Sequence, residues 1–501
     1  MQLKITAGKQ LVRNSVSGVI RSIILAVVLF IVYPIYINKL GTEMFGVWVM
    51  VGVIIGWSQL GSLGIPQTVM KFVAGSVTKG DKEELVEYVS SALTIILLSG
   101  IVIMLILFFI KGSLGNFFRV PPAIKPQIPS FIFFAALVVV VSFLAQGINS
   151  ILSGIGRMDL ANINEIVGKI LEAVISVVLI FKGYGIWGLL FGNMVNFLII
   201  LIFACISSIS VLGFVPYNVK LIKKERIRES ISFGGALAAG SLFAMFLEPF
   251  NRFILGQYVA LSAATVYDVA SRVVLQVRGV LEIAFRPLTP QSSAYFDIGQ
   301  LEKVKKMSRF SVRIICFLGV PIFFILIIWA PELINIWLKI EVQNTSYAIR
   351  IIAFAYIFSL MVTPAYYIFM GIGQKGKCFY VHFILSALNF TLVLLCLFLG
   401  FINLKWVVNV FAFSLIFSSL WLMRASYKEF GARYLTDIKN LAFVSTSIVC
   451  ISFFKFVGLA FNFQGMFNIL LMVASFLIYL AICYAFNLIP IDKIRSYLAE
   501  L

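Results

Sequence analysis

The chain has 501 residues, of which 61% are hydrophobic and only 12% are charged, and its mean hydropathy is +1.04. An ordinary soluble domain is roughly 45–50% apolar and about 25% charged. Water therefore cannot be the solvent for most of this surface, and a soluble enzyme is excluded. The composition predicts an all-α integral membrane protein with many spanning helices.

Residues suited to metal binding or covalent catalysis are sparse in this chain. A single histidine, His382, leaves a histidine-based metal cluster without the ligands it needs. The six cysteines have no paired spacing, and all but Cys378 lie in apolar runs, as expected of small hydrophobic side chains. We therefore expect no metal, no cofactor, no catalytic residues and no enzymatic activity.

Apolar runs of spanning length follow one another along the whole chain. A helix needs about 20 predominantly apolar residues to cross the hydrocarbon core of a bilayer. Fourteen runs meet this length, near residues 18–38, 44–69, 88–110, 130–152, 161–181, 185–209, 231–256, 264–288, 311–332, 347–370, 379–400, 404–424, 440–460 and 466–488. The run at 264–288 is so charged that a hydropathy window could miss it. The loops are short, so no extramembrane domain is expected.

The formal net charge of +19 is explained mainly by topology. Most lysines and arginines outside the spans fall in alternate loops, notably in 220–228, 303–313 and 424–439. Cytoplasmic loops of membrane proteins carry such an excess. The distribution predicts a multi-pass protein of the cell (inner or plasma) membrane with cytoplasmic N- and C-termini, and no nucleic-acid partner.

An internal repeat appears at an offset near 217 residues. Residues 152–157 recur at 369–374, and Gly183 corresponds to Gly400. Repeats of six spans share one orientation, so the two lobes should be related by an axis along the membrane normal. The predicted division is 1–215 for the N-terminal six-helix lobe, 216–229 for a basic cytoplasmic linker, 230–430 for the C-terminal six-helix lobe and 431–501 for two added spans.

Charged residues inside the predicted spans are the strongest functional signal. Each costs roughly 2.5–3.5 kcal/mol at the centre of a spanning helix, so it must face protein or water. At 100° per residue, the charges of the eighth span fall on one face, and those of the fifth span do the same. These residues are Asp268, Arg272, Arg278, Glu282 and Arg286 on the eighth span, and Glu165, Lys169 and Glu172 on the fifth.

Two interpretations of these charges compete. Pairs such as Glu248–Arg252 and Arg278–Glu282 are four residues apart, so local ion pairing could make the charges tolerable. The bases outnumber the acids, however, and Arg21 has no acid within four residues on its own helix.

We therefore favour a cationic cavity, because guanidinium groups suit phosphate oxygens. The candidate substrate-binding residues are Arg21, Arg252, Arg272, Arg278, Arg286 and Arg350, and the candidates for ion coupling are Glu165, Glu172 and Asp268.

Four loose motifs lie between residues 45 and 188. They are Phe45-Gly46-Val47-Trp48, Gly61-Ser62-Leu63-Gly64-Ile65, the stretch 154–162 and the stretch 182–188. Together they resemble the Wzx-type polysaccharide flippases of the multidrug/oligosaccharidyl-lipid/polysaccharide (MOP) exporter superfamily. The resemblance implies a MATE-like fold of two six-helix bundles, here with two extra C-terminal helices and fourteen transmembrane helices in all.

The resemblance also implies a function. Such flippases move an undecaprenyl-pyrophosphate-linked oligosaccharide to the outer leaflet by alternating access, as in O-antigen and lipopolysaccharide synthesis. Their cavity arginines meet the diphosphate and the sugar, which Arg21, Arg252, Arg272 and Arg278 match by helix. The implied partners are the lipid-linked oligosaccharide, membrane lipid and other polysaccharide-assembly membrane proteins. A cation-coupled multidrug exporter of the same fold and a membrane-embedded glycosyltransferase or polymerase stay open as alternatives.

Overall fold

The structure is a computed structural model of the chain. It describes residues 7–118, 120–122, 124–338, 342–434, 436–461, 463, 465–486 and 488. Over these ranges the secondary structure is helical, without a β-strand, and comprises nineteen α-helices. The chain divides into two compact units, Met1–Asp268 and Val269–Leu501, and the boundary falls inside helix α10.

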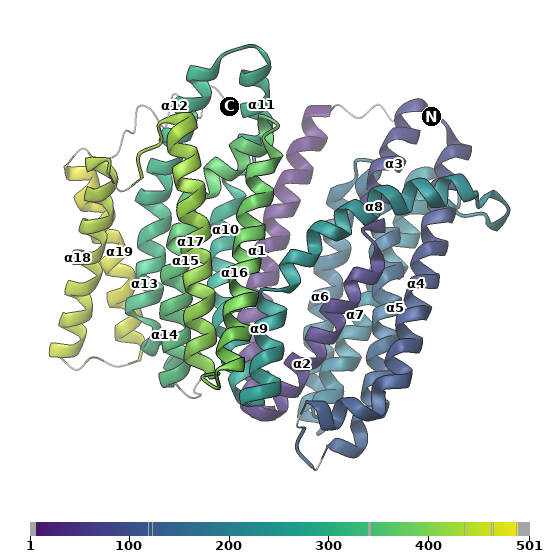
Figure 1. Cartoon of the computed structure of the whole chain (residues 1–501), viewed down its shortest axis with the longest axis horizontal. Coiled ribbons are helices and arrows are strands. Elements are labelled where there is room, and N and C mark those ends of the chain that lie inside the picture. The colour runs from purple at the N-terminus through teal and green to yellow at the C-terminus, as the bar shows by residue number, and fades with distance from the viewer. Residues whose placement is uncertain are drawn as a thin grey trace. The chain divides into compact units, whose positions relative to one another are not determined.

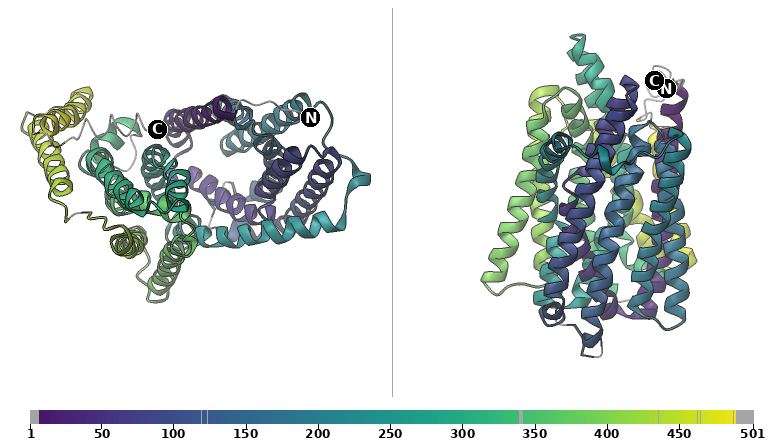
Figure 2. Two further views of the ribbon diagram at one scale, coloured as in Figure 1. Left: turned by 90° about the horizontal axis from the view of Figure 1, so that it is seen from above. Right: turned by 90° about the vertical axis from the view of Figure 1, so that its right-hand side faces the viewer.

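The first unit contains α1 to α9 and the start of α10 (Figure 1). The helices of this unit are α1 (Ala7–Leu40), α2 (Thr42–Ser58), α3 (Ile65–Lys79), α4 (Lys82–Phe117), α5 (Ile128–Gly154), α6 (Met158–Phe181), α7 (Ile186–Leu212), α8 (Lys224–Met245), α9 (Glu248–Ile254) and α10 (Leu261–Ile283). Within it, α5 packs against α3, α4 and α7, and the side chains of Val73, Val89 and Leu152 are fully buried there. Helix α8 runs obliquely across α3 and α4 (Figures 1 and 2).

The second unit contains the rest of α10 and the helices that follow it. These are α11 (Leu288–Asp297), α12 (Leu301–Ile314), α13 (Val320–Ile328), α14 (Ala330–Trp337), α15 (Val342–Gly371), α16 (Lys375–Phe398), α17 (Leu404–Phe430), α18 (Ile438–Ala460) and α19 (Met466–Ala485). Helix α15 is central and packs against α11, α13, α16 and α17. Helices α18 and α19 pack against each other and against α13, and form the yellow pair in Figure 1.

Eleven helical segments of the described chain are long and apolar enough to cross a membrane. They match all of the fourteen predicted spans except 161–181, 231–256 and 264–288, which are the spans that carry most of the interior charges. Phe109, Phe398 and Phe456 are 80%, 88% and 68% exposed. Such apolar side chains are tolerated only where the surrounding solvent is lipid. The chain is therefore a multi-pass membrane protein.

The second predicted span, 44–69, is not one continuous helix. Helix α2 ends at Ser58, a 3₁₀ turn follows at Gln59–Ser62, and Leu63 and Gly64 have left-handed φ angles of 51° and 65° before α3 begins. A Cβ atom on Gly64 would lie 2.5 Å from the carbonyl oxygen of Gly234 on α8. Only glycine permits both this backbone conformation and this approach of two backbones. The helix is interrupted where α8 touches it.

The seventh and eighth predicted spans also end differently from the sequence expectation. The run 231–256 is divided between α8 and α9, with Leu247 between them and Pro249 in the first turn of α9. Proline suits a helix start because it lacks the N–H group that would have no partner there. Helix α10 ends at Ile283 instead of residue 288, so Arg286 lies in the turn before α11 and not on the α10 face.

The backbone agrees with the internal repeat. Gly156 and Gly373, which correspond in the repeat, follow α5 and α15 with φ angles of 81° and 79°. Gly183 and Gly400 follow α6 and α16 with φ angles of 87° and 75°. The same turn thus recurs at the same place in each half, although the boundary between the compact units lies within α10 and not in the 216–229 stretch.

Candidate functional site

The interior of the first unit holds a pair of opposite charges from two helices. Arg21 of α1 forms an ion pair with Glu165 of α6 through both Nε and Nη2. The Nδ2 atom of Asn149 on α5 lies 3.5 Å from Oε1 of Glu165, and the two charged side chains are 34% and 33% exposed. Arg21 has no acid within four residues on its own helix, and its partner comes from a different helix.

A second pair lies farther along α6. Nζ of Lys169 is 2.8 Å from Oε1 of Glu172, as the sequence spacing allows. Glu172 is only 8% exposed, and its Oε2 atom is buried without a hydrogen-bond partner among the described residues. A buried oxygen that accepts no hydrogen bond is costly for a carboxylate.

A third cluster joins α1, α9 and α10 inside the first unit. Nε of Arg252 is 2.9 Å from Oδ1 of Asp268, and its Nη2 is 3.2 Å from Oε2 of Glu248. The hydroxyl of Tyr33 donates to Oδ2 of Asp268 at 3.0 Å. Asp268 is 1% exposed, so these contacts offset the cost of burying its charge. The predicted Glu248–Arg252 pair is confirmed.

The second unit contains a more open arrangement around Arg278 of α10. Its Nε atom is 3.7 Å from Oε2 of Glu282, and the other carboxylate oxygen, Oε1, accepts a 2.7 Å hydrogen bond from the hydroxyl of Tyr367 on α15. The guanidinium carbon lies 5.2 Å from the ring centroid of Tyr356. The Nε atom is buried and donates no hydrogen bond within the described residues. Arg278 is thus an arginine with an unused donor, which can serve an anionic ligand.

The other predicted arginines of this unit differ from one another. Arg272 is half-buried on α10. Arg286 is exposed in the turn that follows α10. Arg350 is exposed on α15, and its Nε donates a 3.0 Å hydrogen bond to the carbonyl of Ile327 in the last turn of α13. Arg350 therefore satisfies a helix-end carbonyl, which gives it a packing role.

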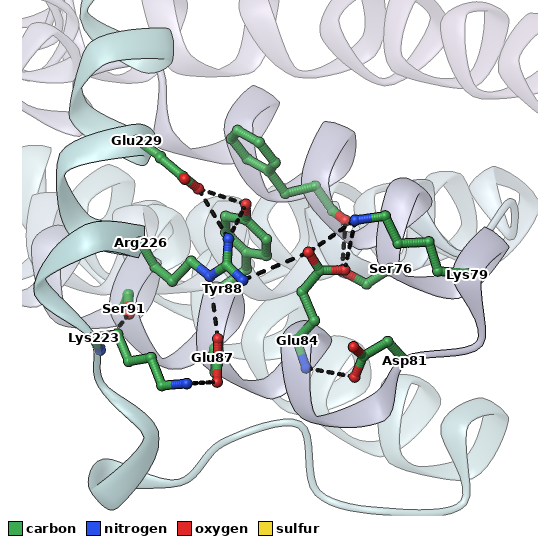
Figure 3. Close-up of polar contacts among 11 residues, drawn as sticks. Ser76, Lys79, Asp81, Glu84, Glu87, Tyr88, Ser91, Lys223, Arg226 and Glu229 are labelled. Atoms are coloured by element: carbon green, nitrogen blue, oxygen red, sulfur yellow. Dashed lines mark hydrogen bonds and ion pairs between the residues drawn. The ribbon is translucent and has the colours of Figure 1, made fainter.

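A polar cluster that the sequence analysis did not single out connects α4 with the start of α8 (Figure 3). Arg226 of α8 is at its centre. Its Nε lies 3.1 Å from Oε2 of Glu87, its Nη1 lies 2.7 Å from the hydroxyl of Tyr88 and 3.2 Å from Glu229, and its Nη2 lies 3.6 Å from Glu84. Lys223 adds an ion pair to Glu87. We call Glu84, Glu87, Tyr88, Lys223, Arg226 and Glu229 the α4–α8 cluster.

The electrostatics of the α4–α8 cluster favour its ionised form. A hydrogen bond to Glu87 raises the pKa of Lys223. Hydrogen bonds from Tyr88 and then Arg226 hold the pKa of Glu229 below its usual range. The one signal in the sequence is that acidic residues 83–87 and the basic stretch 220–228 have opposite charge. The predicted cytoplasmic linker is therefore attached to α4 by specific contacts.

The comparisons with known proteins agree with this architecture. A sequence profile of the family described as polysaccharide biosynthesis protein matches residues 40–341. A candidate O-antigen transporter of Shigella flexneri is 19% identical over 349 residues, which cover 68% of this chain and 80% of that protein.

Two solved structures show the fold. The lipid II flippase MurJ in its inward closed conformation has a TM-score of 0.71 at 13% identity, and the match covers 95% of this chain and 99% of that one. An inward-facing MATE multidrug resistance transporter of the MOP superfamily has a TM-score of 0.66 at 14% identity, covering 81% of this chain and 94% of that one. The all-α, MATE-like fold and the resemblance stated from the sequence are both confirmed.

Proposed function

Because the chain belongs to the polysaccharide biosynthesis protein family, we propose that it is a flippase for an undecaprenyl-pyrophosphate-linked oligosaccharide. It moves this lipid from the cytoplasmic to the outer leaflet by alternating access. The likeness to a candidate O-antigen transporter and to a lipid II flippase supports the proposal. The relatives and structural neighbours are transporters and flippases, so the glycosyltransferase alternative has no support among them.

The observation that carries this proposal is the environment of Arg278. A guanidinium with a buried, unused Nε donor is suited to a phosphate oxygen, which would replace the water that the donor has lost. Glu282 also accepts a hydrogen bond from Tyr367. The Arg278 side chain can therefore turn toward a ligand while Glu282 keeps a hydrogen-bond partner. We assign the pyrophosphate to Arg278 and to Arg272 on the same helix.

The remaining arginines receive different roles in the proposal. Arg21 is one-third exposed and can release Glu165 when an anion binds, since Asn149 also lies close to that carboxylate. Arg252 is held by two acids and serves mainly to neutralise Asp268. Arg286 lies in an exposed turn, where it can meet the soluble glycan, and Arg350 is assigned to helix packing.

Transport against a gradient needs a coupling ion, and Glu172 is the strongest of the three candidates. Glu165 and Asp268 each have an arginine as ion-pair partner. Glu172 has Lys169 on one oxygen and no hydrogen bond on the other within the described chain. A proton on Oε2 would remove a buried negative charge, so we propose proton coupling at Glu172.

The orientation follows the charge distribution. We propose that the basic loops, including 220–228 and 303–313, face the cytoplasm, and that both termini lie on that side of the inner or plasma membrane. A charge bias of this kind sets orientation during insertion.

The decisive experiment measures lipid translocation in proteoliposomes. The purified chain is reconstituted with a fluorescent polyprenyl-pyrophosphate oligosaccharide, and a membrane-impermeant quencher reports the fraction in the outer leaflet. We expect Arg278→Ala to slow translocation by about tenfold or more, because a hydrogen bond to a charged group contributes about 1.5–3 kcal/mol. Arg278→Lys should keep part of the activity, since it retains the charge but not the fork of donors.

Arg350→Ala is the matched control, because it also removes one arginine of a spanning helix but leaves the site around Arg278 intact. Wild-type rates in both Arg278→Ala and Arg350→Ala would contradict the assignment of the pyrophosphate. Uptake of a lipophilic cation that does not depend on Arg278, together with no movement of the polyprenyl lipid, would instead support a multidrug exporter.

A further inference from the structure

The second unit has a pocket of about 740 Å³ that none of the predicted site residues lines. It lies along α12, where α17 ends and α18 begins. Five basic and three acidic side chains line it, which are Lys305, Arg309, Arg313, Lys428 and Arg433, and Glu302, Glu429 and Asp437. The pocket is therefore basic, and its location is separate from the proposed substrate contacts on α10.

The three acidic side chains of the pocket are already paired. Glu302 is 2.7 Å from Lys305, and Asp437 is 3.2 Å from Arg313. Glu429 is 2.6 Å from Lys377, which does not line the pocket. Two of these ion pairs involve a basic residue that lines the pocket, and the third involves Lys377, which lies outside it. The positive charge of the remaining lining is not neutralised by these acids.

The other three basic side chains of the pocket are outside these ion pairs. Arg309, Lys428 and Arg433 are exposed, and none of them is in an ion pair with a carboxylate among the residues that the structure describes. They come from α12, from the last turn of α17 and from the connection to α18. Three such cations around one cavity repel one another, so an anion that bridges them is stabilised.

Hydrogen bonds fix the wall of the pocket on the side of α18. The connection between α17 and α18 is held by Asn440, whose Nδ2 donates to the carbonyls of Arg433 and Tyr434 at 2.9 and 2.8 Å. Asp437 caps α18 by accepting from the backbone N–H of Lys439 at 2.9 Å. The Nε atom of Arg313 is buried and has no hydrogen-bond partner among the described residues, so a donor at the pocket wall is unused.

The surroundings indicate a lipid rather than a soluble anion. Helices α12, α17 and α18 belong to segments long and apolar enough to cross a membrane, and the pocket lies at their charged ends, where lipid headgroups lie. Beside it, Ile438 is 83% exposed on the first turn of α18. A second cavity of about 450 Å³ shares Tyr427 and Arg433, and it is lined also by Met423, Arg424, Ala432, Tyr434 and Thr436. An acyl chain can therefore continue along apolar surface from the basic pocket.

We propose that this pocket binds the phosphate of an anionic phospholipid, with Arg309, Lys428 and Arg433 as the ligands of the headgroup. Basic pockets between spanning helices recognise such headgroups on the cytoplasmic side of membranes. The guanidinium groups supply paired donors to the phosphate oxygens, and Lys428 supplies charge. A bound lipid would join α12 and α17 of the repeat to the added helix α18.

Lipid binding to the full chain in detergent, followed by native mass spectrometry, tests this proposal. The probes are phosphatidylglycerol and cardiolipin, with phosphatidylcholine as the zwitterionic reference and inorganic phosphate as the soluble anion. We expect the wild type to prefer the anionic lipids, and the triple variant Arg309→Ala/Lys428→Ala/Arg433→Ala to bind them about tenfold or more weakly, because each base near an anionic headgroup contributes about 1 kcal/mol.

The matched control is Lys303→Ala/Lys306→Ala/Lys439→Ala. It removes three charges from the same ends of α12 and α18, but none of them lines the pocket. Equal loss in both triple variants would mean a general surface attraction and would overturn the site. Unchanged lipid binding in the pocket variant would also overturn it. Competition by inorganic phosphate as effective as that by phosphatidylglycerol would assign the pocket to a free anion.

A charge-preserving variant guards against misfolding as an explanation. Arg309→Lys/Arg433→Lys should keep the preference for anionic lipid, with an affinity between those of the wild type and the alanine variant. Loss of binding in this variant as complete as in the alanine variant would argue against charge recognition. The measurement needs no transport substrate, so its result is independent of the proposed flippase activity.

Discussion

The acidic residues inside this membrane protein differ in whether each carboxylate oxygen has a hydrogen-bond or ion-pair partner. Glu172 and Glu165 lie on the same helix, yet Glu165 receives an arginine and Glu172 keeps one oxygen without a hydrogen bond in the described chain. Asp268 is enclosed by Arg252 and Tyr33. Of the three acidic residues, Glu172 is therefore the one with a carboxylate oxygen that no described side chain holds.

At this scale we predict that Glu172→Gln abolishes the acceleration of transport by a proton gradient. The amide keeps the shape of the side chain but cannot bind and release a proton, so the rate with an imposed gradient should fall to that without one. Proteoliposome translocation with and without a pH difference measures this. Glu83→Gln, an exposed carboxylate in the first turn of α4, is the control and should respond as the wild type does. A gradient response preserved in Glu172→Gln would exclude this residue as the coupling site.

Residue-level predictions from the sequence succeeded where the partners are neighbours on one helix. The pairs Glu248–Arg252 and Arg278–Glu282 follow from a spacing of four residues, which places two side chains on one face. The pair of Arg21 and Glu165 joins residues 144 positions apart. No spacing rule reaches that far, so the sequence did not predict this pair.

Helices of this protein are joined by ion pairs and hydrogen bonds that cannot be predicted from the amino-acid composition of either helix. Arg226 connects α8 to α4 through Glu87 and Tyr88 (Figure 3). Helix α8 begins the second repeat in sequence, yet it packs against α3 and α4 of the first. The α4–α8 cluster therefore attaches the start of one repeat to the other within the first compact unit.

At the scale of elements we predict that Arg226→Ala lowers the Tm of the purified protein by about 2 °C or more, because it removes several charge-assisted hydrogen bonds at once. The pKa of Glu229 is lowered in the folded state, so its contribution is present above its unfolded pKa of about 4.3 and is lost as pH falls through the folded value. The pKa of Lys223 is raised, so its contribution is lost only as pH rises through a value above about 10.4.

Thermal unfolding across pH checks both signs. The difference in Tm between the wild type and Arg226→Ala should be constant between about pH 5.5 and pH 9 and should shrink in stronger acid. Lys220→Ala, an exposed lysine three residues before Lys223 and outside the cluster, is the control and should have the Tm of the wild type. A difference that grows as the pH falls would show that the cluster is not held by ionised carboxylates.

Element boundaries were harder to predict than the elements themselves. The sequence placed one helix over 231–256, but Phe246 and Leu247 separate α8 from α9, and Pro249 lies in the first turn of α9. Hydropathy does not register such an interruption because the residues on both sides are apolar. Likewise, Arg286 was placed on the eighth span, and the end of α10 at Ile283 removes it from that face.

The whole molecule is organised by the bilayer. Alternate loops carry the basic residues, and α7 separates a loop at 182–185 from the basic segment at 213–223. We predict that a cysteine replacing Tyr184, which is 54% exposed, reacts with a membrane-impermeant maleimide in intact cells. A cysteine replacing Tyr217, which is 46% exposed, should react only after the cells are opened.

The native cysteines Cys205 and Cys396, which are partly accessible, are first replaced by serine. Labelling of Tyr217→Cys from outside would reverse the proposed orientation. Labelling of both positions from outside would mean that α7 does not cross the membrane.

The sequence by itself determined that this is an all-α protein of the membrane, that it is built from a repeat, and that it resembles the polysaccharide flippases. Those properties depend on composition and on local periodicity, which the solvent imposes on every spanning helix alike. Only the tertiary structure decided which charges are paired, because ion pairs such as Arg21–Glu165 and Arg226–Glu87 form between helices far apart in the chain. The same holds for the basic pocket, whose lining comes from α12, α17 and the start of α18 and exists only when these ends meet.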